Sequence, residues 1–301
     1  MQTKKQIQNL LEAAGVRPNK QLGQHFLIDL NLMRLLVDRA RINNDDVVLE
    51  VGCGTGSLTE GIAEKTGFCV AVELDGTLAR IAEQRLARAG NVAVINTDIL
   101  ESKNAIDPAV TNALNTHLKE YSGRLLLVAN LPYNAASAVI INLITGPIRA
   151  DAMYATVQKE VADRMTASPG GAEYGTLSIF IGAGGDIRME RILKPSVFWP
   201  RPQVSSAMVS FERIENKAGR IHNMATFREL VSLLMSHRRK MLQSCVRFAR
   251  EKLAGITDWQ SIFERALIEP RARPEQLSPE QYVILANLCD TQLKSETGGR
   301  I

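Results

Sequence analysis

The fold of this chain is decided by one stretch near its start, Val47-Val48-Leu49-Glu50-Val51-Gly52-Cys53-Gly54-Thr55-Gly56-Ser57. Its first five residues are mostly apolar and β-branched and follow a turn-prone run at residues 43–46, which predicts a buried strand. The alternating glycines then permit a tight turn, and because they lack a Cβ they let a ligand lie against the backbone before the next helix. The stretch therefore predicts a ligand site at the carboxyl end of a buried strand.

Further strands are predicted at residues 68–73, 92–96, 125–130 and 153–157, with helical patterns between them, for example at residues 78–88. Strands that alternate with helices indicate βαβ units. The predicted fold class is α/β, a Rossmann-like parallel sheet with helices on both faces. Ligands of such sheets bind beyond the carboxyl ends of the strands.

The pattern of predicted secondary structure changes after Phe211. Residues 215–219 form a polar hinge candidate, and helical patterns without strand signals follow it. We therefore expect two domains, a ligand-binding domain at residues 1–213 with a basic amino-terminal segment at residues 1–27, and a small all-helical domain at residues 214–301.

Charge is distributed unevenly along the chain. The 36 Lys and Arg residues exceed the 32 Asp and Glu residues, which gives a net charge of +4. Residues 1–212 hold 21 basic and 22 acidic groups, whereas residues 213–301 hold 15 basic and 10 acidic groups. The run Arg238-Arg239-Lys240 is the densest part of this excess. It is either a solvated face or, if the rest of the chain needs a polyanion, a phosphate-binding surface.

Composition excludes several protein classes. With 45% hydrophobic and 23% charged residues among 301, the chain is not of the disordered type. Its apolar runs are shorter than the roughly 18 residues of a membrane span, and its first residues lack a signal-peptide core, so we expect a cytoplasmic protein. The four cysteines lie far apart without a CxxC pair, and the histidines are scattered, so we expect buried reduced thiols and no metal site.

The spacing of residues around the glycine turn limits the classes of ligand that can bind there. A dinucleotide fingerprint G-x-G-x-x-G that starts at Gly52 would need glycine where Ser57 stands, which disfavours a hydride-transferring oxidoreductase. Glu73 ends the second strand, where a carboxylate can accept hydrogen bonds from ribose hydroxyls. Asp98 follows the third strand, where it can accept a hydrogen bond from the exocyclic amine of adenine. For both acids an ordinary strand-end role is the alternative.

The tetrad Asn130-Leu131-Pro132-Tyr133 at the end of the fourth strand is the most informative motif. The exocyclic nitrogen of adenine is a poor nucleophile, because its lone pair is delocalised into the ring. The Asn130 side-chain oxygen and a backbone carbonyl such as that of Leu131 can hold its two N–H bonds and aim the lone pair at an electrophile. Tyr133 offers a face on which an extruded base can stack. Methyl transfer from a sulfonium needs such alignment rather than a metal.

The chain resembles the ribosomal RNA small-subunit adenine dimethyltransferase family, the KsgA/Dim1 group, which is similar to the erythromycin-resistance rRNA methylases. The resemblance extends from about residue 17 to about residue 280. It is carried by the glycine turn, the tetrad and the motifs at residues 20–27, 157–164, 174–178, 198–206, 237–240 and 273–278.

The resemblance implies S-adenosyl-L-methionine as the cofactor. It implies that this cofactor is held by Gln24, His25, Leu27, Gly52, Gly54, Gly56, Glu73, Asp98 and Asn130. It further implies that Tyr133 and Phe198 sandwich the target base, and that Asn130 and Leu131 hold its amine. The implied substrate is a pair of adjacent adenosines in the 3′-terminal hairpin of small-subunit (16S) rRNA, each dimethylated at N6 in a pre-mature small subunit during ribosome biogenesis, by an enzyme expected to be a monomer. Arg238, Arg239 and Lys240 would then bind rRNA phosphates.

Three alternatives remain open. A resistance-type methylase of large-subunit rRNA would share the tetrad, although Leu131 in place of isoleucine and the carboxyl-terminal motifs favour the small subunit. A DNA adenine methylase would share the chemistry but would need a base-reading element, which is not evident here. A non-catalytic RNA-binding assembly factor would keep the fold without turnover, which the intact site residues argue against.

Overall fold

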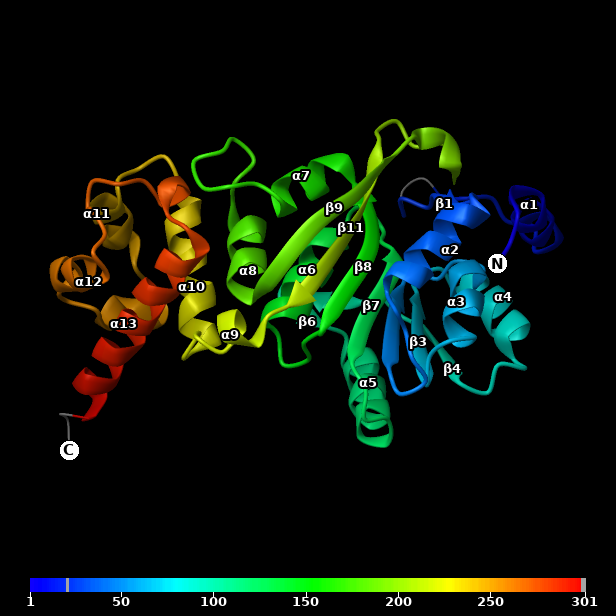
Figure 1. Cartoon of the computed structure of the whole chain (residues 1–301), viewed down its shortest axis with the longest axis horizontal. Coiled ribbons are helices and arrows are strands. Elements are labelled where there is room, and N and C mark those ends of the chain that lie inside the picture. Colours follow the sequence, from blue (N-terminus) through cyan, green and yellow to red (C-terminus); the bar gives the residue numbers. More distant parts are fainter. Residues whose placement is uncertain (20–21, 299–301) are drawn as a thin grey trace. The chain divides into compact units, whose positions relative to one another are not determined.

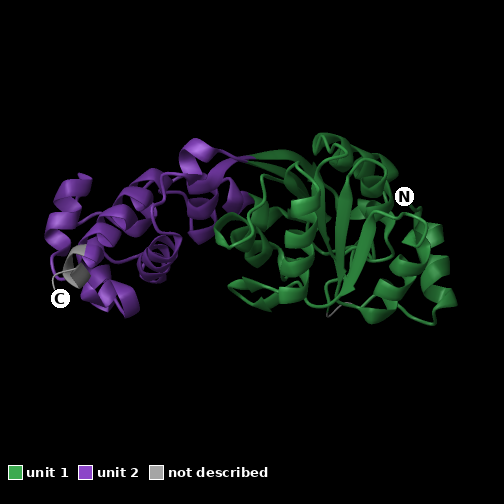
Figure 2. Ribbon diagram, turned by 90° about the horizontal axis from the view of Figure 1, so that it is seen from below, with its two compact units in different colours: residues 1–162, 188–212 green, residues 163–187, 213–301 purple. Residues whose placement is uncertain are grey.

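The computed structural model describes residues 1–19 and 22–298. Lys20 and Gln21, which belong to the motif at residues 20–27, lie outside the described residues. Contacts divide the chain into two compact units, residues 1–162 with 188–212 and residues 163–187 with the chain from 213 onward. Figure 2 colours these units separately.

The first unit is built on a seven-stranded sheet with the order β4-β3-β2-β7-β8-β11-β9 (Figure 1). The predicted strands are present, as β2 (Val47–Val51), β3 (Phe68–Glu73), β4 (Val92–Asn96), β7 (Leu125–Asn130) and β8 (Ala152–Gln158). These five strands run parallel to one another. The predicted Rossmann-like α/β class is confirmed.

Two strands at one edge extend this sheet beyond the prediction. They are β9 (Gly185–Leu193) and β11 (Ser206–Arg213), and β11 pairs antiparallel with β8. Neither was predicted, because charged residues interrupt the strand pattern of β9 and the buried Ser206 and Ser210 interrupt the apolar run of β11. Two small pairs also form, β1 (Phe26–Leu27) with β10 (Phe198–Trp199) and β5 (Leu100–Ser102) with β6 (Ala105–Ile106).

Helices pack against this sheet, with α3, α4 and α5 contacting β3 and α2 contacting β8. Capping residues fix where several helices begin. Asp75 accepts hydrogen bonds from the backbone N–H groups of Thr77 and Leu78 at the start of α4, and Asp107 caps α5 in the same way. The helices are α1 (Lys4–Ala13), α2 (Leu30–Arg39), α3 (Ser57–Ala63), α4 (Gly76–Leu86), α5 (Pro108–Glu120), α6 (Ala136–Thr145) and α7 (Lys159–Met165). The last three residues of α7 belong to the second unit.

The second unit is helical, as expected. Its helices are α8 (Thr176–Gly184), α9 (Glu215–Ala218), α10 (Met224–Ser236), α11 (Leu242–Cys245), α12 (Trp259–Ala266) and α13 (Pro279–Gly298), with short 3-10 turns between them. The predicted boundary near residue 214 corresponds to the point where the chain enters this unit for the second time. The structure corrects the assignment of residues 163–187, because α8 packs on α9, α10 and α13 rather than on the sheet.

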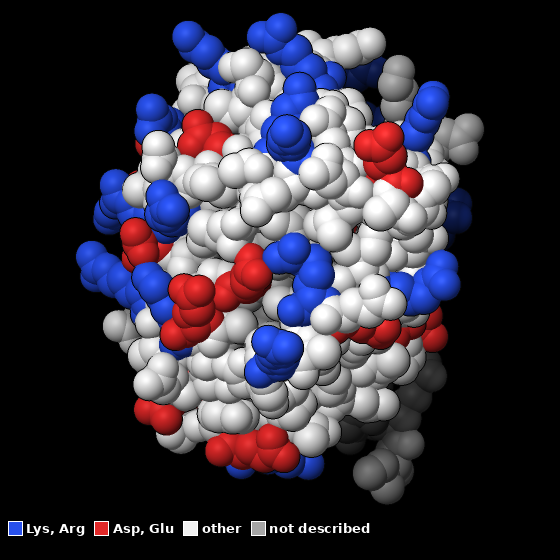
Figure 3. Space-filling view, turned by 90° about the vertical axis from the view of Figure 1, so that its right-hand side faces the viewer, with Lys and Arg blue, Asp and Glu red and all other residues white. Residues whose placement is uncertain are grey.

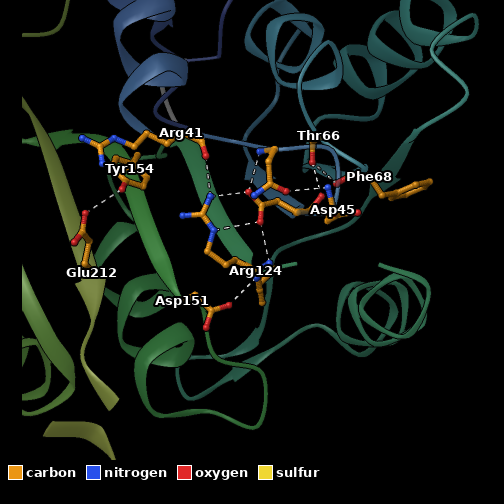
Figure 4. Close-up of polar contacts among 11 residues, drawn as sticks. Arg41, Asp45, Thr66, Phe68, Arg124, Asp151, Tyr154 and Glu212 are labelled. Atoms are coloured by element: carbon orange, nitrogen blue, oxygen red, sulfur yellow. Dashed lines mark hydrogen bonds and ion pairs between the residues drawn. The ribbon is translucent and has the colours of Figure 1, made fainter. Parts of the chain in front are cut away.

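An ion pair between the half-buried Arg124 and a buried carboxylate stabilises the amino-terminal edge of the sheet (Figure 4). Asp46, which is 0% exposed, accepts hydrogen bonds from the Arg124 guanidinium at 2.7 and 3.2 Å. Burial raises the pKa of Asp46, but the hydrogen bonds and charge of Arg124 outweigh burial and lower it. The pair links β2 to β7 at the edge opposite the carboxyl ends of the strands.

The distribution of surface charge, the burial of the cysteines and the lengths of the helices can be compared with the expectations from the sequence. Lys and Arg are interspersed with Asp and Glu on the side of the molecule that carries α1 and α4 (Figure 3). Cys53, Cys69, Cys245 and Cys289 are all buried, as predicted. Within the described part of the chain, every helix is too short or too polar to cross a membrane.

Candidate active site

A cavity of about 330 Å³ lies in the first unit beyond the carboxyl ends of β2, β3, β4 and β7. Ten of the residues predicted from the sequence line it, namely Gln24, His25, Leu27, Gly52, Gly54, Glu73, Asp98, Asn130, Leu131 and Tyr133. The parallel sheet explains this convergence, because parallel strands bring the loops that follow them to one edge.

The glycine turn needs its glycines for backbone conformation and close packing. Gly52, Gly54 and Gly56 have φ values of +75°, +59° and +76°, in the region that side chains rarely adopt. A Cβ on Gly52 would lie 3.0 Å from Pro132, so the glycine turn and the tetrad are in contact. Gly56 lies outside the cavity lining; it precedes α3, and a Cβ there would meet Leu86 at 3.1 Å.

Glu73 holds the glycine turn in place. Its Oε2 accepts a hydrogen bond from the Gly54 backbone N–H at 2.8 Å, and its Oε1 accepts one from Asp75 N–H at 2.9 Å. Burial raises the pKa of Glu73, while these hydrogen bonds oppose the increase. Each carboxylate oxygen has a second lone pair, so ribose hydroxyls can still bind. Asp98 is exposed at the rim and accepts a hydrogen bond from Leu100 N–H at 2.9 Å.

The amino-terminal segment covers part of the cavity. The Gln24 side chain donates to Asp75 Oδ2 at 3.1 Å and accepts from Asn19 N–H at 2.7 Å. His25 donates from Nδ1 to the Pro200 carbonyl at 2.7 Å, and Leu27 is buried in β1. These contacts hold the segment against the body of the first unit and leave its backbone along the cavity wall.

The amide of Asn130 is fixed at both of its polar atoms. Its Nδ2 donates to the His25 backbone carbonyl at 2.8 Å, and its Oδ1 accepts from the Thr156 hydroxyl at 2.5 Å. A carbonyl oxygen has two lone pairs, so Oδ1 can accept one further hydrogen bond. The arrangement can therefore hold an amine in one orientation.

The expected aromatic pair is only half formed. Tyr133 lines the cavity, and its hydroxyl lies 2.8 Å from Ser206 Oγ. Phe198, expected opposite Tyr133, is 3% exposed and packs in the same apolar cluster as Leu27, because β10 pairs with β1 and turns this ring into the core. The ring that lies beside Tyr133 is His25, at 5.3 Å between centroids. The predicted position of Phe198 therefore differs from the observed one.

Glu50, which was not predicted as a site residue, also lines the cavity. It is 2% exposed in β2, and within the described residues its Oε2 has no hydrogen-bond partner. Burial, with a smaller contribution from the charge of Glu73, raises the pKa of Glu50 to about 8. The signal was present, since an acid in an otherwise apolar strand requires a reason.

Comparison with known proteins identifies the family. The family model described as ribosomal RNA adenine dimethylase matches residues 15–289. The chain belongs to this family. Dimethylases of this family methylate adenosines of ribosomal RNA, so the chain is an rRNA adenine dimethyltransferase.

Individual relatives agree with this family, and solved structures share its fold. The ribosomal RNA small subunit methyltransferase A of Halothermothrix orenii is 33% identical over 96% of this chain and 94% of its own length. That of Geobacter metallireducens is 35% identical over 92% of this chain and 97% of its own. Among solved structures, a dimethyladenosine transferase from Plasmodium falciparum superposes with a TM-score of 0.69 at 20% identity, covering 89% of this chain and 98% of its own. The 23S rRNA methyltransferase ErmE gives 0.59 at 20% identity, with 88% and 99% covered.

The basic run of the dimethylase lies in its second unit, and its members differ in availability. Arg238 is held within the protein, since its Nε donates to Glu275 at 3.1 Å and its guanidinium reaches the Ala172 carbonyl at 3.2 Å. Arg239 and Lys240 are exposed, and the Lys240 ammonium lies 5.4 Å from the ring centre of Phe248. Two of the three predicted RNA-binding residues are therefore free to meet a phosphate, whereas Arg238 would first have to leave Glu275.

Proposed function

We propose that this dimethylase transfers methyl groups from S-adenosyl-L-methionine to N6 of two adjacent adenosines in the 3′-terminal hairpin of small-subunit rRNA. The observation that carries the proposal is the Asn130 amide, held at a cavity wall with one lone pair of Oδ1 available. A second acceptor, the Leu131 carbonyl, is part of the same tetrad.

The residues around the cavity fit this cofactor. The glycine turn leaves room where a Cβ would collide, and Glu73 and Asp98 supply acceptors for hydroxyl and amine groups. The unpartnered Oε2 of the buried Glu50 suits a cation such as an ammonium group, which would compensate its burial. When bound, the cofactor supplies an electrophilic methyl group on a sulfonium.

The roles of the protein groups then follow from their positions. Asn130 and the Leu131 carbonyl hold the two N–H bonds of the target amine, which favours a pyramidal nitrogen. Tyr133 supplies a stacking face for the flipped base, worth roughly 1–3 kcal/mol. Alignment of this kind can lower a barrier by about 7–11 kcal/mol. The surplus proton leaves the methylated amine to solvent.

Phe198 can stack on the target base only if its ring moves from the observed position. A second stacking face from Phe198 requires the ring to leave the core cluster in which it is buried. His25 already lies beside Tyr133 and limits one side of the base pocket.

The second unit supports rRNA binding through charge. Residues 213–301 carry 15 basic against 10 acidic groups, and Arg239 and Lys240 are exposed. Basic side chains on one surface bind phosphates without reading sequence. We place this work in the cytoplasm, on a pre-mature small subunit, and expect the enzyme to act as a monomer.

A large-subunit methylase is the second candidate, because ErmE shares the fold. The relatives at 33–35% identity are named for the small subunit, which favours our proposal. The test is to incubate the protein with labelled cofactor and unmethylated small subunits, naked rRNA or large subunits, and to identify the labelled nucleoside after digestion. Dimethyladenosine confined to the small subunit supports the proposal, and label in the large subunit selects ErmE-like activity.

A further inference from the structure

A buried threonine hydroxyl lies between two apolar residues near the carboxyl end of β8. Thr156 is 1% exposed, and its strand neighbours Ala155 and Val157 are equally buried. In the parallel pairing of β7 with β8, Thr156 stands opposite Asn130. No role for Thr156 was predicted from the sequence. A buried hydroxyl needs a partner, and the partner here is the side chain that the proposed reaction depends on.

The two hydrogen bonds of the Asn130 amide have different consequences. The His25 carbonyl can only accept, so it selects the orientation in which Nδ2 points toward it, at 2.8 Å. The Thr156 hydroxyl then donates to Oδ1 at 2.5 Å and fixes the other end of the amide. With both ends held, the amide plane cannot rotate, and the remaining lone pair of Oδ1 has one direction.

Thr156 also holds the next residue of the tetrad. Its backbone carbonyl accepts a hydrogen bond from Leu131 N–H at 3.1 Å. This bond belongs to the backbone and survives any side-chain substitution at this position. A change at Thr156 that removes only the hydroxyl therefore isolates the contact to Asn130.

We propose that Thr156 is a positioning residue for methyl transfer, whose hydroxyl aims Asn130 Oδ1 at the amine of the target adenine. The proposal rests on the role assigned to Asn130 above. Without the hydroxyl, Asn130 keeps its bond to His25 but its oxygen can swing. Misplacement of a reacting group by about 1 Å can cost on the order of a hundredfold in rate.

The test compares Thr156→Val, which keeps the shape and loses the hydroxyl, with Thr156→Ser, which keeps the hydroxyl. We expect Thr156→Val to lower kcat by about tenfold to a hundredfold. The Kd for S-adenosylmethionine, measured by calorimetry, and the KM for small subunits should each change by less than about twofold, because no binding group is removed. Thr156→Ser should restore kcat to within about threefold of the wild type.

Thr66→Val is a matched control for the substitution itself. Thr66 is a buried threonine at the opposite edge of the sheet, where its hydroxyl donates to the Asp46 carbonyl at 2.7 Å (Figure 4). Its loss should lower the unfolding temperature and leave kcat unchanged.

Three outcomes would overturn the role of Thr156. These are a wild-type kcat in Thr156→Val, a failure of Thr156→Ser to restore activity, or equal losses in kcat and cofactor affinity. If Thr156→Val does not fold, Thr156→Ser still decides, since a folded serine variant with less than about one tenth of wild-type kcat contradicts the proposal. A wild-type enzyme that labels no adenosine would instead refute the proposed function and is distinguishable from all of these.

Discussion

Replacing Glu50 by glutamine removes a buried carboxylate from the cavity wall without changing its volume. The pKa of Glu50 rises from an ordinary 4.5 to about 8, chiefly because burial penalises the charged form. Between these values the unfolded chain loses the proton while the folded protein keeps it, so stability falls as pH rises. A shift from 4.5 to 8 corresponds to on the order of 5 kcal/mol at pH 8.

The expected result is a difference that depends on pH. In cofactor-free protein, Glu50→Gln should be close to the wild type in free energy of unfolding at pH 5, and more stable by several kcal/mol at pH 8. Urea unfolding at pH 5, 6, 7 and 8 measures this. Glu83→Gln, at an exposed position on α4, removes the same charge without burial and should leave the curve unchanged.

The reasoning would be refuted if the two unfolding curves ran parallel from pH 5 to pH 8. Calorimetry adds an independent check, because a cationic group beside Glu50 needs the ionised form. The affinity for S-adenosylmethionine should therefore increase with pH in the wild type and stay flat in Glu50→Gln. An equally steep increase in both proteins would remove Glu50 from the cofactor site.

Three further predictions concern transfer, packing and RNA binding. Asn130→Ala should lower methyl transfer by at least about 10²–10³-fold while the calorimetric Kd for the cofactor stays nearly unchanged, because the lost acceptor acts on the target amine. Gly52→Ala should cost about 1–2 kcal/mol of stability for the left-handed backbone, and more for crowding against Pro132, as measured by urea unfolding. The double variant Arg239→Ala/Lys240→Ala should reduce the salt dependence of rRNA affinity by about two units of slope.

Each of these predictions has a control and a contradicting result. Equal losses of transfer and cofactor binding in Asn130→Ala would argue for a structural role. Gly90→Ala, where a Cβ would meet open space, should be nearly neutral, and an equal loss there would contradict the packing argument. An unchanged salt slope would remove Arg239 and Lys240 from the RNA interface, and a larger effect from Arg238→Ala would show that its pair with Glu275 opens on binding.

Most of the sheet could be predicted because local patterns encode it. The five parallel strands are short, apolar and bounded by turn residues, and their boundaries agree closely with the prediction. The edge strand β9 could not be recognised in the same way, since it carries charged side chains and derives its stability from its partner β11, which lies between β8 and β9. The transfer of residues 163–187 to the second unit likewise depends on contacts with α13, more than 90 residues further along the chain.

The sequence by itself determined the five parallel strands, the glycine turn, and the edge at which Glu73, Asp98 and Asn130 meet. These follow from periodicity and from the rule that loops after parallel strands converge. Only the tertiary structure decided that Phe198 packs in the core, that Arg238 is held by Glu275, and that Thr156 fixes the Asn130 amide. The physical reason is that the residue type at each position fixes the chemistry of its side chain. The partners of that side chain depend instead on how segments far apart in the chain pack and pair.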